Sequence, residues 1–254
     1  MKKHSYLFSI LIFFLIVSKL GFSQTMDSAA VKPFNDGLAK SQKANYKDAL
    51  LDFETALKFD KDYRIYYQIG FAQQNLNNAE EAITAYKQTI KAKPDFDAAY
   101  NNLGNVYFSQ GNYQDAIDNF QKVLEISKDD TIKNAVKYNM ALAYTNLGMA
   151  SEKAKNNKKA VSDLSKAVSF YDYDAAYLFL ARDYFLLNQF DKAIEASQKA
   201  IKYKKTISEG AAYYWMGVSY SKKKDMKKAK EYLELAKTDP AYKSFAETVL
   251  KSLK

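Results

Sequence analysis

Cysteine is absent from the 254 residues of this chain, and histidine occurs once, as His4. Without cysteine the chain has no disulfide framework, so its fold depends on the apolar core alone. The lack of both residue types after position 4 excludes Ser-His-Asp and Cys-His catalysis, the common zinc hydrolases and structural zinc sites. Glycine-rich phosphate loops and the GxGxxG pattern are missing too, so we expect neither a metal nor a cofactor.

Arginine is nearly absent, since Arg64 and Arg182 are the only two, and the net charge of +9 comes from lysine. Nucleic-acid readers favour arginine because its planar fork makes paired hydrogen bonds to bases and phosphates. We therefore expect no nucleic-acid partner. The lysine runs in 153–159 and 222–228 are interpreted as solvated surface, and weak contact with an anionic surface is the alternative.

The first 24 residues differ from the rest of the chain. Lys2 and Lys3 precede an apolar run over 6–17, and small residues stand at Gly21 and Ser23. This order is typical of a secretory signal peptide with cleavage after Ser23. The alternative is an uncleaved membrane anchor, although the apolar run is shorter than the ~20 residues that a bilayer span requires. We expect a periplasmic or secreted protein.

Apolar residues make up 48% of the chain and recur with helical spacing after this segment. In residues 100–107, apolar and small side chains stand three and four positions apart, on one helix face. Gly111 and Asn112 interrupt the pattern, and residues 115–124 resume it with a second apolar stripe. The spacing predicts a helix, a short turn and an antiparallel second helix.

The same unit recurs along the chain in steps of about 34 residues. Most copies carry a small residue in the first helix and an alanine in the second. These positions are Gly37, Ala49, Gly70, Ala82, Gly104, Ala116, Ala160, Ala193, Gly217 and Ala229. Glycine in a helix costs about 1 kcal/mol relative to alanine, so its placement indicates close backbone approach. We expect Gly104 to face Ala116, and we place Gly111 and Gly148 in turns.

These residues resemble the tetratricopeptide repeat family, whose pattern is aromatic-x-x-Leu-Gly-x-x-Tyr, then Ala-x-x-x-Phe, then Pro. The resemblance covers about 30–241. It implies an all-α, right-handed superhelical solenoid of about six helix-turn-helix repeats plus a C-terminal capping helix. The expected organisation is a signal peptide at 1–23, a short linker at 24–29 and an array over 30–254, with repeats at 30–62, 63–96, 97–133, 134–173, 174–206 and 207–241 and a cap at 240–253.

The fourth copy departs from the pattern by seven extra residues between its two halves, near 149–157. Seven residues are about two helical turns, so we expect a first helix prolonged to about Lys155, a turn at Asn156 and Asn157, and a longer second helix. This extension is interpreted as structural, and a dedicated contact surface is the alternative.

The last residues of the array predict a capping helix, which a stacked array needs to cover its final unit. Asp239 is the expected N-cap and Pro240 lies in the expected first turn. The stripe Phe245, Val249 and Leu253 is expected to face the preceding unit.

In the family that this chain resembles, the first helices line a concave groove. The resemblance implies that their residues outside the packing positions face a partner. These residues are Tyr67, Phe71, Asn101, Asn105, Phe108, Tyr138, Leu178, Arg182, Phe185 and Tyr214. Side-chain amides can hydrogen-bond an extended peptide, and aromatic rings can contact its side chains. Packing between units is the alternative role, notably for Phe71 and Phe108.

One subtype of the family binds the C-terminal carboxylate of chaperones through a clamp of lysine, asparagine and arginine side chains. Asn105 and Asn139 match the two asparagines, but the basic positions fall on Asn101, Ala175 and Phe179. Without those charges this chain lacks the clamp.

The sequence favours a non-catalytic protein–protein interaction scaffold of the bacterial cell envelope that holds a peptide or protein segment in its groove. A carbohydrate- or anionic-polymer-binding module of the envelope is the alternative. A helical-array glycan hydrolase is the third hypothesis, because paired catalytic carboxylates have no fixed sequence spacing. The acidic pairs at 80–81 and 129–130 are more simply explained as complements to helix N-termini. We therefore expect no enzymatic activity and a protein or extended peptide as the partner.

Overall fold

The computed structural model describes residues 25–253, and this part of the chain forms thirteen α-helices without any β-strand. The predicted all-α architecture is confirmed, while the predicted signal peptide lies outside the described residues. The first helices of the successive pairs are α1 (Ser28–Gln42), α3 (Tyr63–Asn75), α5 (Asp97–Ser109), α7 (Asp130–Lys153), α9 (Asp174–Leu186) and α11 (Glu209–Lys222). The second helices are α2 (Tyr46–Phe59), α4 (Ala79–Ala92), α6 (Tyr113–Ile126), α8 (Asn157–Phe170), α10 (Phe190–Lys202) and α12 (Met226–Lys237), and α13 (Lys243–Ser252) follows the last pair.

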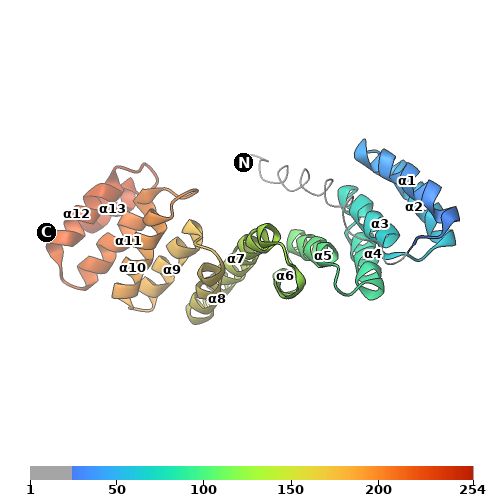
Figure 1. Ribbon diagram of the computed structural model, residues 1–254. Coiled ribbons are helices and arrows are strands. Elements are labelled where there is room, and N and C mark those ends of the chain that lie inside the picture. Colours follow the sequence, from blue (N-terminus) through green and yellow to red (C-terminus); the bar gives the residue numbers. More distant parts are fainter. Residues whose placement is uncertain (1–24, 254) are drawn as a thin grey trace.

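Each helix packs mainly on the helices before and after it in the chain, and contact is most extensive within a pair. The pairs follow one another in chain order, with α1 and α13 at opposite ends of an elongated row (Figure 1). First helices of neighbouring units also touch, as α9 does with α11 and α11 with α13. The stability of such a row comes from its units and the interfaces between neighbours.

Three residues connect the two helices of every pair, and the middle one has a positive φ. These middle residues are Ala44, Asn77, Gly111, Lys155, Asn188 and Lys224, with φ between 57° and 79°. The following N–H closes the first helix, as when Asn112 N donates to Tyr107 O at 2.9 Å. Only one of the six turns uses glycine, which is why glycine alone is a poor guide to them.

A small residue in the first helix leaves room for a large side chain sixteen positions later. The pairs are Gly37–Phe53, Gly70–Tyr86, Gly104–Phe120, Gly148–Leu164 and Gly217–Leu233, and an added Cβ on the glycine would lie 2.6 or 2.7 Å from the larger partner. The prediction that Gly104 faces Ala116 is wrong, because the Phe120 ring is the nearest neighbour. Ala116 is fully buried one turn earlier in α6. The same burial holds for Ala49, Ala82, Ala160, Ala193 and Ala229.

The fifth unit replaces the glycine with Ala181, and the residue sixteen positions later is Ser197. Both residues are fully buried, and the Ser197 hydroxyl donates to Ala193 O at 2.9 Å. The fifth unit therefore departs here from the pairing of a glycine with a large side chain.

Helix α7 has 24 residues, whereas the other first helices have 13 to 15. Gly148, predicted in a turn, lies inside α7 against Leu164, and Lys155 takes the turn position instead. The prediction of a longer second helix is also wrong, because α8 has 14 residues, as α2, α4 and α6 do. The extra turns lie at the start of α7.

The two halves of α7 serve two different interfaces. Val136 and Met140 join the apolar cluster of α6 around Phe120, and Gly148 farther along pairs with Leu164 of α8. Seven residues bring a helix back to nearly the same face, since two turns contain 7.2. Ala141 and Gly148 therefore both fit the small-residue position, and sequence spacing could not show which of them pairs with α8.

The capping helix α13 begins at Lys243, three residues after the predicted start, because Asp239 forms a turn first. Asp239 accepts from Ala241 N at 2.8 Å, and its carboxylate also pairs with the Ser208 hydroxyl. Two residues of the predicted stripe, Val249 and Leu253, face the preceding unit as expected. Phe245 does not, because it is 59% exposed while the adjacent Ala246 is fully buried. Val249, Leu250 and Leu253 pack with Ala246 against the last pair.

We expect Gly104→Ala to lower the free energy of unfolding by about 1–3 kcal/mol, as overpacking does, although alanine favours a helix over glycine by about 1 kcal/mol. The reason is the Phe120 ring, 2.6 Å from the new Cβ. Urea unfolding followed by circular dichroism measures the change. The control is Gly111→Asn, because no atom lies within 4 Å of its added Cβ and the same turn position holds Asn77 and Asn188. The control should stay within about 0.5 kcal/mol of wild type. A Gly104→Ala variant as stable as wild type would contradict the pairing.

Candidate functional site

The odd-numbered helices from α1 to α13 form one side of the array, called here the first-helix face. The ten residues predicted to meet a partner all lie on these helices, but their surroundings differ. Tyr67 is only 4% exposed and packs between the rings of Tyr86 and Phe96, with centroids 5.8 and 5.1 Å away. Its hydroxyl accepts from Asn102 Nδ2 at 2.9 Å, and burial raises its pKa. Tyr67 is a core residue.

Phe71 and Phe108 are half-buried and each packs on a tyrosine at the start of a second helix. The ring of Phe71 meets Tyr46 of the preceding unit at 6.1 Å, and Phe108 meets Tyr113 of its own unit at 5.4 Å. Both contacts are edge-on, the geometry that aromatic pairs prefer. These two phenylalanines therefore help to hold helices together and offer a partner only part of their surface.

Asparagine side chains occupy the middle of the first-helix face. Asn139 Nδ2 donates to Asn105 Oδ1 across neighbouring units at 3.4 Å. Asn101 Oδ1 is buried and accepts no hydrogen bond. A buried amide oxygen without a donor costs about 1–3 kcal/mol, so Asn101 would gain from an N–H group brought by a ligand.

Tyr138 and Leu178 connect this middle region to the C-terminal half. Tyr138 is 36% exposed and its ring lies edge-on to Tyr171 at 5.0 Å and to Tyr173 at 6.1 Å. Leu178 is half-buried against the apolar cluster of α8, α9 and α10. Tyr138 is the more accessible of the two.

A continuous row of rings crosses the C-terminal half from α9 over α11 to α13. Phe185 lies 5.5 Å from Trp215, Trp215 lies 5.2 Å from Tyr214, and Tyr214 lies 5.7 Å from Tyr242 and 6.2 Å from Phe245. The row ends at the exposed ring of Phe245. These five residues are called the aromatic platform.

Sequence reasoning found Phe185 and Tyr214 of this platform but missed Trp215, Tyr242 and Phe245. Trp215 is the only tryptophan of the chain, which was an available signal. Phe245 was assigned to the core because it stands four residues before Val249. Ala246, three residues before Val249, takes the buried position instead, and both spacings fit one helix face.

Arg182 pairs with Glu152 of α7 and lies 5.1 Å over the ring of Phe179, so it ties the fourth unit to the fifth. Asp183, the next residue, is fully buried, and neither of its carboxyl oxygens accepts a hydrogen bond from a donor group. Burial and the adjacent Glu152 carboxylate raise the pKa of Asp183 to about 8, against the opposing charge of Arg182. Asp183 is therefore largely protonated at neutral pH.

This carboxyl pair does not form an accessible acid–base site, because Asp183 has no exposed surface. The acidic pairs singled out in the sequence lie at helix starts. Asp129 caps α7 by accepting from Thr131 N at 2.7 Å, and Glu80 and Glu81 lie in the first turn of α4. Across residues 25–253, no three His, Cys, Asp or Glu side chains gather closely enough to bind a metal ion. No helix in the same range combines the length and hydropathy needed to cross a membrane.

Models of the tetratricopeptide repeat match most of the array. One tetratricopeptide repeat model matches residues 98–130, a TPR repeat model matches 75–111, and a further tetratricopeptide repeat model matches 141–172, 174–207 and 210–238. The match to the fourth unit begins at 141, so the first turns of α7 fall between two repeats. This position agrees with Gly148, rather than Ala141, as the residue that pairs with α8.

The curated relatives resemble this chain over part of their length. Photosystem I assembly protein Ycf3 of Prochlorococcus marinus is 32% identical over 108 residues, which cover 41% of this chain and 60% of that protein. Small glutamine-rich tetratricopeptide repeat-containing protein 2 of Mycosarcoma maydis is 27% identical over 142 residues, covering 50% and 39%. The matched region thus spans less than two thirds of either relative.

Two solved structures share the fold. The C-terminal part of a TPR repeat-containing protein from Cytophaga hutchinsonii superposes with a TM-score of 0.59 at 18% identity, over 86% of each chain. YrrB, described as a TPR protein with an unusual peptide-binding site, gives 0.51 at 21% identity over 78% of this chain and 97% of its own. Because the repeat models together cover more than half of the chain and coincide with its helix pairs, this chain belongs to the tetratricopeptide repeat family.

Proposed function

We propose that this protein is a non-catalytic scaffold that holds an extended segment of another protein against its first-helix face. The observation that carries the proposal is the aromatic platform, which presents five rings from three helices. Aromatic side chains supply much of the energy of protein interfaces because they bury a large area with few rotatable bonds. A partner segment with apolar side chains fits this surface best.

The exposure of the platform supports the same proposal. Phe245 is 59% exposed, and Leu186 at the end of α9 is 53% exposed. Large apolar side chains grouped on the surface of a soluble chain are a common mark of a binding site. The asparagines of α5 and α7 add hydrogen-bonding groups farther along the face, so the partner backbone has polar contacts as well.

The family context is consistent with a scaffold. Ycf3, one of the relatives, is named as an assembly protein for photosystem I, and stacked repeats of this kind present extended binding surfaces. We assign to this chain the holding role alone.

We further propose that the protein works in an extracytoplasmic compartment, on the basis of the N-terminal sequence pattern. The chain purified from its native cells should then begin at Gln24, as measured by N-terminal sequencing. A chain that keeps Met1 and sediments with membranes would favour the anchored alternative, and a soluble chain that keeps Met1 would contradict both.

The platform is tested with Phe245→Ala and the matched control Phe59→Ala. Both phenylalanines are similarly exposed, at 59% and 54%, but Phe59 ends α2, outside the first-helix face. A peptide is selected from a random-peptide phage library on residues 24–254, and its Kd is measured by fluorescence anisotropy. Phe245→Ala should weaken binding about tenfold, the effect of losing roughly 1.4 kcal/mol of contact, and Phe59→Ala should leave the Kd unchanged. Equal effects of the two variants would rule out the platform as the binding surface.

The buried carboxyl pair beneath Arg182 makes the stability of the array depend on pH. The pKa of Asp183 is about 8 in the folded chain and about 3.9 for a free aspartate. The folded chain therefore holds one more proton than the unfolded chain in this window. Since unfolding releases that proton, the free energy of unfolding falls as pH rises from about 4 to about 8 and levels off above it.

Asp183→Asn should remove this dependence. Wild type should lose up to about 1.4 kcal/mol of unfolding free energy per pH unit in this window, and the variant should lose clearly less. Urea unfolding in buffers across the window measures both slopes. Asp95→Asn is the control, because the Asp95 side chain is 78% exposed, and it should keep the wild-type slope. Parallel slopes for wild type and Asp183→Asn would contradict a protonated Asp183 in the folded chain.

A further inference from the structure

The connection between α10 and α11 is longer than the others between units. Residues 203–208 form it, whereas three residues connect α2 to α3, α6 to α7 and α8 to α9, and four connect α4 to α5. In Figure 1 this loop projects from the orange part of the array. It carries Lys204 and Lys205, and Lys202 stands at the end of α10 just before it.

Asp174, at the start of α9, holds this loop in one conformation. Its Oδ2 accepts from Lys205 N and Thr206 N at 2.6 Å each and from Ile207 N at 3.1 Å, and its Oδ1 accepts from the Thr206 hydroxyl at 3.0 Å. Burial alone would raise the pKa of Asp174. The hydrogen bonds from these donors have the larger effect and hold the pKa of Asp174 below the ordinary value. The carboxylate therefore stays ionised, and the loop is fixed before any ligand arrives.

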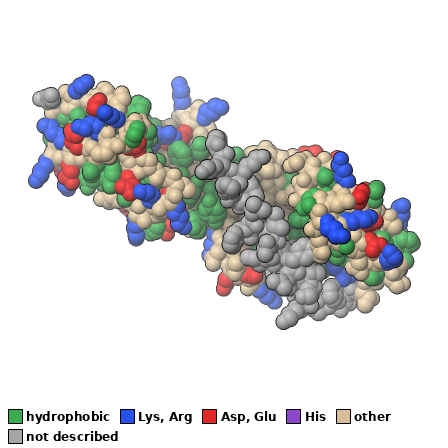
Figure 2. All heavy atoms as spheres, turned by 90° about the horizontal axis from the view of Figure 1, so that it is seen from above, with side chains coloured by type: hydrophobic (Ala, Val, Ile, Leu, Met, Phe, Trp, Pro, Cys, Tyr) green, Lys and Arg blue, Asp and Glu red, His purple; other side chains and the backbone are tan. Residues whose placement is uncertain are grey.

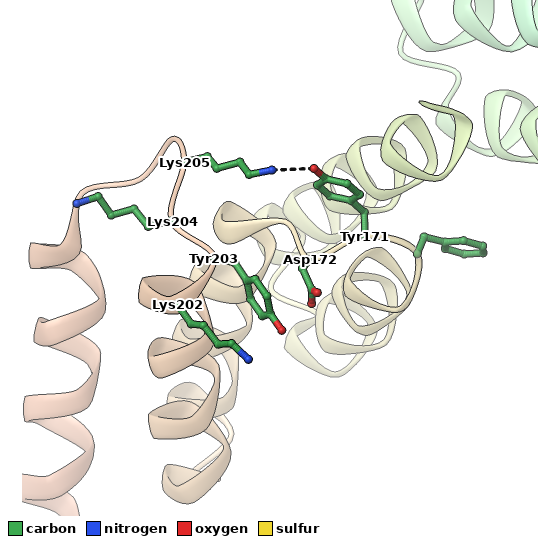
Figure 3. A pocket seen from close by; sticks show the side chains of 7 residues that line it. Tyr171, Asp172, Lys202, Tyr203, Lys204 and Lys205 are labelled. Atoms are coloured by element: carbon green, nitrogen blue, oxygen red, sulfur yellow. Dashed lines mark hydrogen bonds between the residues drawn. The ribbon is translucent and has the colours of Figure 1, made fainter. Parts of the chain in front are cut away.

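The fixed loop borders an open pocket of about 510 Å³ at the edge of the array. Phe170, Tyr171, Asp172 and Tyr203 supply its walls together with the three lysines (Figure 3). Figure 3 shows Lys205 reaching from the loop toward Tyr171, where its ammonium donates to the phenol oxygen at 2.9 Å. Tyr203 stacks on Tyr177 at 5.7 Å. The volume is within the range of small-ligand sites, roughly 300–1,000 Å³.

Among the described residues, Lys202 and Lys205 have no carboxylate within ion-pair distance, unlike several other lysines of the array. Lys199 and Lys122 pair with glutamates one turn away, at 2.8 and 2.7 Å. Lys205 instead contacts Tyr171, and the Lys202 ammonium lies 4.9 Å over the ring of Tyr203.

The other charged side chains of the pocket lining are Lys204 and Asp172. Lys204 pairs with Glu209 at 2.7 Å, and the Asp172 carboxylate, which accepts from the Tyr177 hydroxyl at 2.7 Å, opposes part of the positive charge. Elsewhere, acids and bases are mixed over the surface, as the face in Figure 2 shows. The lining therefore holds three ammonium groups against one carboxylate.

We propose that this pocket binds the carboxylates of an acidic peptide segment. Ammonium groups form charge-assisted hydrogen bonds with carboxylates, and each lysine offers three donors to such an acceptor. Tyr171 lies 5.0 Å from Tyr138 on the first-helix face, so one extended segment can reach both surfaces. This continuity favours a peptide over a detached polymer.

The test uses fluorescein-labelled hexaglutamate as the probe and hexaglutamine as the uncharged control, at roughly 0.15 M salt, where distant charges are screened. Lys202→Gln/Lys205→Gln removes the pocket charges, and Lys222→Gln/Lys227→Gln removes two exposed lysines at the turn between α11 and α12. Both variants lower the net charge by the same amount. The pocket variant should lose tenfold or more in affinity for hexaglutamate, and the control variant less than threefold.

Several results would overturn the proposal. Equal losses in the two variants would mean that bulk charge, not the pocket, binds the probe. Tighter pocket-dependent binding of polyphosphate or polygalacturonate than of hexaglutamate would assign the pocket to another class of ligand. No hexaglutamate binding to wild type would also reject it. Phe245→Ala should leave hexaglutamate binding unchanged, so failure here and failure of the aromatic platform are told apart.

Discussion

In five of the six repeats a large side chain of the second helix packs directly on the backbone of the first, where a glycine leaves room for it. Phe120 against Gly104 is representative, since any Cβ on Gly104 would meet the ring at 2.6 Å. This contact sets the distance between the two helices and thereby the surface that the pair presents to its neighbours. The fifth unit has Ala181 and Ser197 at the two positions, both fully buried, so the array also accommodates a unit without this pairing.

Helix α7 shows how the array accommodates a change of spacing. Its first turns pack on α6, and its last turns pair with α8. The extension adds helix without breaking the row, because Val136 and Met140 serve the interface with α6 and Gly148 serves the one with α8. Arg182 of α9 pairs with Glu152 near the end of α7, beside the buried Asp183, so charged groups also connect α7 to α9.

The two proposed binding surfaces are built in different ways. The aromatic platform depends on three first helices in contact, and its rings support one another across units. The lysine pocket depends on a single buried carboxylate, Asp174, which holds the loop at residues 203–208 in one conformation. Rigid surfaces lose little conformational entropy when a ligand binds, which is the advantage of placing both on a repeat scaffold.

Local spacing was enough to predict the helix pairs, the family and the buried alanines, because one face of a helix repeats every three to four residues wherever it meets a core. It could not distinguish Ala141 from Gly148, since a seven-residue step returns to the same face, and it could not tell that Tyr67 turns inward while Phe245 turns outward. Trp215, Tyr242 and Phe245 meet only when α11 and α13 are packed, and Asp174 meets residues 205–207 only across a whole unit. Contacts of this kind join positions about thirty residues apart, and their geometry is set by how neighbouring units stack rather than by the sequence of either one.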